Sequence, residues 1–244
     1  MTYCVALRLN RGLVFAADTR TSAGNDNVAI FRKLHFWRKM GERVVVLASA
    51  GNLAVTQSVI SIINEQLVAE LSPEAESLFT VPTMYRAARL VGEAVREVHR
   101  VDGPPLEASG GSFNANFILG GQIGSEVPRL FHIYPEGNFI EATDDTPYFQ
   151  IGEHKDGKPI IDRVAQPTMR LGEAAKLALL SFDSTLRSNL SVGLPIHLLI
   201  YERDSLDVRR QKRIEQEDEY FRKLSAAWSE ALRSAFAGIE EFKV

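Results

Sequence analysis

Alternating apolar and polar positions dominate the first fifty residues and predict strands. Residues 3–9 alternate with a period of two, which is the pattern of a strand with one buried face. A turn at 10–12 leads into an apolar run at 13–17, so these two segments predict a hairpin. Two further strands are expected at 34–38 and 43–49.

Helical spacing of apolar residues follows the first block of strands. Asn52 is a plausible N-cap for a helix that reaches Leu67, because its apolar residues fall on one stripe. A second amphipathic helix is expected from about Pro82 to Arg100, and the Gly-Pro-Pro sequence at 103–105 is expected to end it.

A second block of strands precedes the remaining helices. The expected strands lie at 114–122, 129–134, 138–141 and 147–151. After them we expect a helix at 171–188, a strand at 195–202 and a charged helix from Arg213 onward. The order predicts one domain over 1–244, in which two packed sheets are covered by helices and 203–244 form a helical extension.

Composition and charge remove several classes of function. The 244 residues are 45% hydrophobic with a net charge of -3, which argues against nucleic acid as a partner. The longest apolar run, 44–50, is too short to cross a bilayer, so no membrane span is expected. A single cysteine, Cys4, cannot form an intrachain disulfide and suits the reducing cytoplasm, where we expect the protein to act.

Four separate features carry candidate chemistry. Removal of Met1 would leave Thr2 at the N-terminus, where one residue supplies both a nucleophilic hydroxyl and a basic amine. Asp18 ends an apolar strand, Lys33 enters another, and Gly51 lies where a strand meets a helix.

Each feature also has a plain structural interpretation. Many chains begin Met-Thr, Asp18 would cap a turn, Lys33 would be solvated, and the small residues around Gly51 would allow close packing. The histidines lack metal-ligand spacing and no cofactor motif is present, so neither a metal nor a cofactor is expected.

Taken together, these features resemble the proteasome β-subunit family. The resemblance rests on Thr2, on ADTRTSAG at 17–24, on Lys33 and on SAGN at 49–52. The opening sequence is most similar to the bacterial group of that family called Anbu, the ancestral β-subunit. The resemblance implies an α+β fold, the four-layer α-β-β-α sandwich of N-terminal nucleophile hydrolases, here with an extended C-terminal helix.

The resemblance also implies a role for each residue of the motifs. Thr2 would attack a peptide carbonyl, its amine would take the proton, and Lys33 would lower the pKa of that amine. Asp18 would hold Lys33, and the Gly51 N–H would stabilise the oxyanion. Arg20 would support the catalytic residues without taking part in the reaction.

Substrate binding and assembly follow from the same resemblance. Thr21, Phe31 and Ser49 fall where the family builds its specificity pocket, which we expect to be neutral and partly filled by Phe31. Peptides are the expected substrate. The expected particle is a homo-oligomer, as a ring or an open spiral, with an unidentified ATPase or co-encoded protein as a possible partner.

The sequence departs from the family at two turns near the nucleophile. A Gly-Ser-Gly turn is replaced at 151–154 by Ile-Gly-Glu-His, and Asn189 and Val192 stand where the family has Asp and Ser. Ser191 is the nearby hydroxyl that would compensate. Two alternatives to an N-terminal threonine peptidase therefore stay open. One is a small-amide hydrolase or amide-forming transferase of the same superfamily, and the other is a catalytically silent assembly scaffold.

Overall fold

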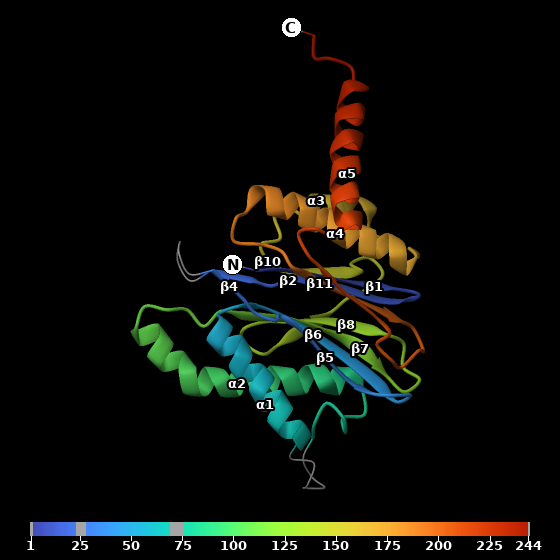
Figure 1. Ribbon diagram of the computed structural model, residues 1–244. Helices are drawn as coiled ribbons and strands as arrows, with labels where there is room; N and C mark the ends of the chain where they lie inside the picture. Colours follow the sequence, from blue (N-terminus) through green and yellow to red (C-terminus); the bar gives the residue numbers. More distant parts are fainter. Residues whose placement is uncertain (1, 23–27, 69–75, 244) are drawn as a thin grey trace.

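The computed structural model describes residues 2–22, 28–68 and 76–243. Two five-stranded antiparallel sheets are stacked face to face, and helices cover the outer face of each sheet (Figure 1). The expected α+β sandwich of four layers is therefore confirmed. Gly24, which ends the ADTRTSAG motif, lies outside the described residues. None of the helices in the described ranges is long and apolar enough to cross a membrane.

The first sheet carries the N-terminal hairpin in its centre. Its spatial order is β10 (Tyr148–Gly152), β1 (Tyr3–Leu9), β2 (Gly12–Asp18), β11 (Ile196–Glu202) and β12 (Arg210–Ile214). Strands β1 and β2 pair from Cys4–Ala17 to Leu9–Gly12, as the turn at 10–12 predicts. Asp18, at the end of β2, therefore comes to lie beside the start of β1.

The second sheet carries the sequence that follows. Its spatial order is β5 (Leu34–Lys39), β6 (Arg43–Gly51), β7 (Ala115–Ile123), β8 (Arg129–Ile133) and β9 (Phe139–Glu141). A separate two-stranded ribbon is formed by β3 (Arg20–Ser22) and β4 (Val28–Ile30). This ribbon links the end of β2 in one sheet to the start of β5 in the other.

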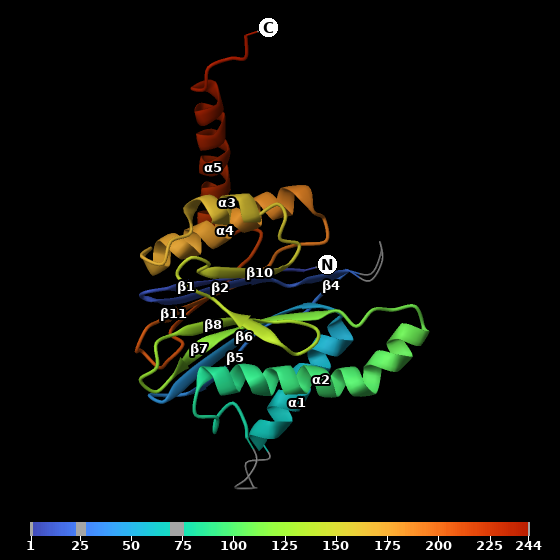
Figure 2. The same ribbon diagram turned by 180° about the vertical axis from the view of Figure 1, so that it is seen from behind.

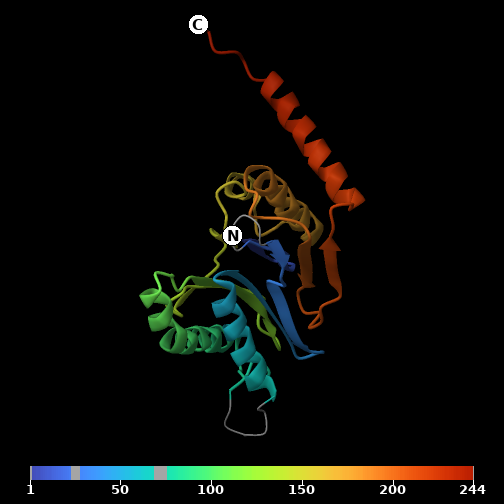
Figure 3. The same cartoon turned by 60° about the vertical axis from the view of Figure 1, so that its left-hand side comes forward.

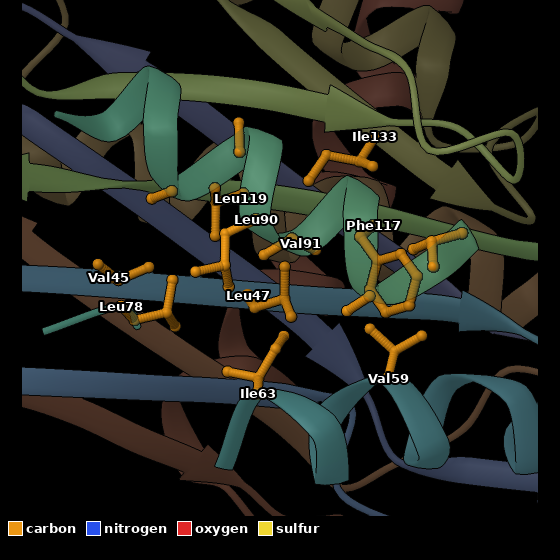
Figure 4. Close-up of a cluster of buried hydrophobic side chains, with 14 of the residues drawn as sticks. Val45, Leu47, Val59, Ile63, Leu78, Leu90, Val91, Phe117, Leu119 and Ile133 are labelled. Carbon is orange, nitrogen blue, oxygen red and sulfur yellow. The ribbon is translucent and has the colours of Figure 1, made fainter. Parts of the chain in front are cut away.

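The helices divide between the two sheets. α1 (Leu53–Val68) and α2 (Met84–Ala108) pack on the second sheet, and α4 (Leu171–Ser188), next to α3 (Lys158–Val164), packs on the first. Figure 4 shows α1 and α2 side chains such as Val59, Ile63 and Val91 meeting Leu47 and Phe117 of the sheet. α5 (Glu219–Ala237) projects away from the sandwich (Figure 3).

Strand β1 is buried on both faces, which differs from the half-buried strand that its alternation predicts. Tyr3, Val5 and Leu7 face the layer of α3 and α4, while Cys4 and Ala6 lie in the core between the two sheets. The small side chains of Cys4 and Ala6 let the two sheets approach closely, so this face of β1 is buried although its residues are less apolar than those of the other face.

Helix α2 continues beyond Arg100 to Ala108, so the prediction that the Gly-Pro-Pro sequence ends it is wrong. Pro104 and Pro105 lack the N–H groups of a regular helix, and α2 bends at this end instead of stopping (Figure 2). The ring of His99 packs against Gly103 and supports the bend, since a Cβ at Gly103 would lie 3.1 Å from that ring.

The segment after residue 203 is not wholly helical, which corrects the expected helix from Arg213. Residues 210–214 form strand β12, which pairs with β11 and buries Ile214. Tertiary pairing at the free edge of β11 outweighs the charged, helix-like composition of this segment. The helix begins only at Glu219, where the Asp218 carboxylate accepts a hydrogen bond from the Phe221 N–H at 2.9 Å.

Candidate active site

Asp18 ends the apolar strand β2 and is completely buried. Its Oδ1 accepts hydrogen bonds from the Lys33 Nζ at 2.9 Å and from the Tyr3 N–H at 3.1 Å. Its Oδ2 accepts a bond from the Gly193 N–H at 3.4 Å. One carboxylate therefore ties together the start of β1, the entry to β5 and the loop before β11.

Lys33 is not solvated, although a basic pair at 32–33 suggests an exposed rim. Only 4% of Lys33 is exposed, and its Nζ also donates to the Arg20 carbonyl oxygen. Burial raises the pKa of the Asp18 carboxyl, while the Lys33 ammonium and the N–H donors act in the opposite direction. The pair is thus a buried ion pair with further hydrogen bonds on both partners.

Thr2 lies directly before β1 and is 7% exposed. Its carbonyl oxygen accepts a hydrogen bond from the Glu153 N–H at 2.7 Å. Gly152 approaches the same carbonyl so closely that a Cβ there would lie 1.9 Å from the oxygen. Gly152 has a φ of +79°, so glycine is needed both for its conformation and for this contact. The backbone on the carbonyl side of Thr2 is therefore fixed.

Gly51 ends β6 and lines the same cavity as Thr2, whose volume is about 490 Å³. A Cβ at Gly51 would lie 2.0 Å from the Asn114 carbonyl oxygen, and its φ is +116°. Asn52 follows and caps α1 as expected, since its Oδ1 accepts from the Ala54 N–H at 3.0 Å. The strand-to-helix turn thus places the backbone of Gly51 at the wall of the Thr2 cavity.

The loop at 189–193 joins the site through its backbone. Arg20 donates to the Leu190 carbonyl oxygen at 2.9 Å and packs on Gly193, where a Cβ would lie 2.1 Å from the Arg20 Nε. Asn189 accepts from the Ser191 N–H at 2.9 Å, so its side chain stabilises a local turn. Within the described residues, the Ser191 hydroxyl has no hydrogen bond to the rest of the site.

Phe31 and Ser49 line a second cavity of about 420 Å³. Arg32 and His35 also line it, so the pocket carries a positive charge and is not neutral as expected. Burial lowers the pKa of His35 to about 4, which leaves its imidazole uncharged at neutral pH. Thr21 lies outside this lining, and its Oγ1 is buried without a hydrogen-bond partner in the part of the chain that the structure describes.

Cys4 lies close to the site but is part of the packing. Its thiol is within 3.5 Å of the Ser49 carbonyl oxygen, to which it donates, and the residue is fully buried. Burial raises the pKa of the Cys4 thiol well above its ordinary value, so the thiol stays protonated at neutral pH.

Sequence reasoning missed most of the wall of the Thr2 cavity. The polar residues of this wall come from β7 and the residue before it, from β8, and from β10 and the turn after it. They are Asn114, Asn116, His132, Gln150, Glu153 and His154. Only the turn at 151–154 carried a signal, as a departure from the family pattern. The other residues lie far apart in the chain and meet only through the order of the strands.

Comparisons with known proteins agree on one family. The family model described as "Proteasome subunit" matches residues 2–199. The comparison with curated proteins finds no match.

Solved structures of the Anbu group are similar over the whole chain. Anbu from Hyphomicrobium sp. strain MC1 is 69% identical with a TM-score of 0.93, and 100% of both chains is covered. Anbu from Yersinia bercovieri is 53% identical with a TM-score of 0.92, covering 100% of this chain and 99% of that one. The helical assembly of the Anbu complex from Pseudomonas aeruginosa is 45% identical with a TM-score of 0.93, covering 99% and 98%. The chain therefore belongs to the proteasome subunit family, in which it is similar to the Anbu group.

Proposed function

We propose that the protein is an N-terminal threonine hydrolase that cleaves amide bonds in peptides, with Thr2 as the nucleophile after removal of Met1. The observation that carries this proposal is the buried ion pair of Asp18 and Lys33. Because the Asp18 carboxylate also accepts the N–H of Tyr3, the pair is fixed one residue from Thr2. The Lys33 ammonium in that position would lower the pKa of the Thr2 amine.

In the first step, the Thr2 Oγ attacks the carbonyl carbon of the substrate and its proton passes to the α-amine of Thr2. A free α-amine has a pKa of about 7.7–8.0, and a nearby ammonium lowers it, so Lys33 favours the basic form. The carbonyl oxygen becomes an oxyanion that the Gly51 N–H stabilises, and such a donor contributes about 3–4 kcal/mol elsewhere.

In the second step, the oxyanion collapses and the bond to the substrate nitrogen breaks. The Thr2 ammonium returns its proton to that nitrogen, so a neutral amine leaves and an ester to Thr2 remains. Water then attacks the ester, again with the α-amine as base, and the Thr2 Oγ regains its proton. The net reaction consumes one amide and one water and yields one acid and one amine.

The cavity lined by Phe31 and Ser49 is the proposed site for the side chain of the acyl residue. Ser49, near the end of β6, lines this cavity, and Gly51, at the end of the same strand, lines the Thr2 cavity. Arg20 and Gly193 act as positioning residues, because they hold the 189–193 loop against Asp18. Asn189 and Ser191 take part through that loop and not by contact with substrate.

Self-assembly into a particle is the second part of the proposal. α5 projects from the sandwich and, with the residues just after it, exposes Leu232, Phe236, Ile239 and Phe242. Exposed apolar surface of this kind marks a contact with another protein, and the Pseudomonas aeruginosa relative forms a helical assembly. We therefore propose that copies of this chain dock through α5. An ATPase or co-encoded partner and a cytoplasmic location stay predictions from the sequence.

A peptide epoxyketone or vinyl sulfone, followed by a peptide library, tests the catalytic part. We expect an adduct on Thr2 in wild-type protein, none in Thr2→Ala, and cleavage of at least one class of peptides. An adduct with turnover of small amides, but of no peptide, would favour the small-amide hydrolase or transferase instead. No adduct and no turnover would leave the assembly scaffold as the function.

A further inference from the structure

The Thr2 cavity has a wall chemistry that the proposed hydrolysis does not use. It has a volume of about 490 Å³, and Thr2 and Gly51 lie on one side of it. Its other walls combine the apolar Ala50 and Ile151 with three amides, two imidazoles and one carboxylate. Among the described residues that line it, none is a lysine or an arginine, and Glu153 supplies the one carboxylate side chain.

Glu153 is held in place by its backbone while its side chain is unpaired. Its N–H donates to the Thr2 carbonyl oxygen at 2.7 Å, which fixes residue 153 beside the nucleophile. The side chain is half-buried, and within the described ranges it forms neither an ion pair nor a hydrogen bond. A half-buried carboxylate without a side-chain partner can bind a cationic group that enters the cavity.

Hydrogen bonds among the wall residues determine which of their side-chain atoms remain as acceptors. Gln150 donates its Nε2 to the Tyr3 hydroxyl at 2.5 Å, which leaves the Gln150 Oε1 as an acceptor. Asn116 donates to the Asn114 Oδ1 at 3.1 Å, so its own Oδ1 accepts from the His132 Nε2 at 3.2 Å. Because burial lowers the pKa of His132, its ring is neutral and its Nδ1 is a further acceptor.

The position of the cavity determines which part of a substrate reaches it. The cavity of Phe31 and Ser49 lies on one side of the β6 end, and the Thr2 cavity, with Ala50 and Gly51 in its wall, lies on the other. If the acyl side chain fills the first, the group on the scissile nitrogen enters the second. A donor-rich, positively charged group matches the acceptors and the carboxylate found there.

We propose that the Thr2 cavity selects substrates whose released amine fragment carries a cationic side chain, lysine or arginine, next to the scissile amide, and that Glu153 is the specificity-determining residue. This proposal rests on the proposed function of Thr2. Gln150 and His132 contribute as acceptors for the N–H groups of the same side chain. The reaction itself is unchanged, since the cationic group only binds.

Two peptides with the same acyl part test the proposal, one with lysine and one with norleucine directly after the scissile amide. Wild-type protein is expected to cleave the lysine peptide with a kcat/KM about two- to fivefold higher, the upper part of the range for one partly exposed ion pair. Glu153→Gln keeps the size of the side chain and is expected to reduce the ratio to about one. Glu136→Gln is the matched control, because Glu136 lines a different cavity and its change leaves the ratio unaltered.

Binding gives a readout that does not depend on turnover. In titrations with L-lysinamide and L-norleucinamide, wild-type protein is expected to bind lysinamide more tightly, and Glu153→Gln to bind both equally. Equal kcat/KM values and equal binding in wild-type protein would overturn the proposal.

A different role for Glu153 would have its own signature. If Glu153→Gln shifts the pH profile of probe addition to Thr2 but keeps the lysine preference, Glu153 pairs with the Thr2 amine and the proposal is wrong. If wild-type protein forms no Thr2 adduct at all, the proposed function fails, and the lysinamide titration still decides what the cavity binds.

Discussion

The Lys33 Nζ donates a hydrogen bond to the Asp18 Oδ1 at 2.9 Å, and water reaches almost none of either side chain. The same Oδ1 accepts the Tyr3 N–H, so the ion pair and the residue that follows Thr2 share one oxygen atom. Loss of either charge would leave the other buried without its partner. The pair therefore links the stability of the fold to the reactivity of Thr2.

Lys33→Met tests that link. Removal of one partner from a buried pair costs about 3–5 kcal/mol, so we expect urea to unfold this variant at a clearly lower concentration. The double variant Asp18→Asn with Lys33→Met removes both charges and is expected to regain part of that stability. Neither variant should form the Thr2 adduct at the wild-type rate. An unfolding midpoint of Lys33→Met equal to that of wild-type protein would contradict the buried-pair account.

Gly51→Ala tests the close approach at the end of β6. The new Cβ would lie 2.0 Å from the Asn114 carbonyl oxygen, so the backbone at the Thr2 cavity must move. Gly41→Ala is the matched control, since Gly41 has a φ of +73° but nothing lies within 4 Å of its Cβ position. We expect Gly41→Ala to cost about 1–2 kcal/mol for its backbone conformation alone. Gly51→Ala should lower the free energy of unfolding by more than Gly41→Ala does, and it should also slow probe addition to Thr2. Equal effects of the two substitutions on stability and on probe addition would refute the close-approach account.

Stability is expected to fall as the pH drops from about 6.5 to about 4, because burial lowers the pKa of His35 to about 4. In that window the unfolded chain binds a proton at this residue and the folded chain does not, so acid favours unfolding. The pKa values of His132 and His197 are lowered by burial too and add in the same direction.

Melting temperatures between pH 8 and pH 4 measure this dependence. Each kcal/mol lost corresponds to a fall in Tm of about 2–4 °C for a chain of this size. His35→Gln should flatten the part of the curve between about pH 6.5 and pH 4. A His35→Gln curve that keeps the full wild-type slope would show that His35 does not titrate in this way.

The apolar end of α5 is expected to control assembly. Phe236 is 80% exposed, so Phe236→Glu should leave the sandwich folded while the sedimentation coefficient falls to that of the monomer. Ser234→Glu adds the same charge to another face of the helix and should preserve the particle. Particles that persist in Phe236→Glu would show that α5 is not the contact.

Much of the first sheet and of the candidate site was readable from the sequence. The hairpin of 3–9 and 13–17 is local, and its turn fixes the register that brings Asp18 beside Tyr3. Lys33 and Gly51 were predicted because their spacing follows a family motif. In the structure Lys33 pairs with Asp18, and Gly51 lines the same cavity as Thr2. Motif spacing succeeds here because it reports a tertiary arrangement that local pattern alone does not contain.

The rest depended on contacts between distant segments. Residues 210–214 are charged and look helical, yet they form a strand because β11 offers an unpaired edge. Pro104 and Pro105 usually end a helix, but α2 continues to Ala108, and the His99 ring packs on Gly103 just before the two prolines. The polar residues of the Thr2 cavity come from three strands and a turn, so no single stretch of sequence predicts which side chains line it.

Intact-mass measurement of the purified protein, before and after treatment with a peptide epoxyketone, tests the central claim most directly. Every proposed catalytic role requires a free Thr2 amine. We predict a mass that lacks Met1 and a single adduct that disappears in Thr2→Ala. A chain that keeps Met1 and gains no adduct would contradict the account of Thr2 as the nucleophile.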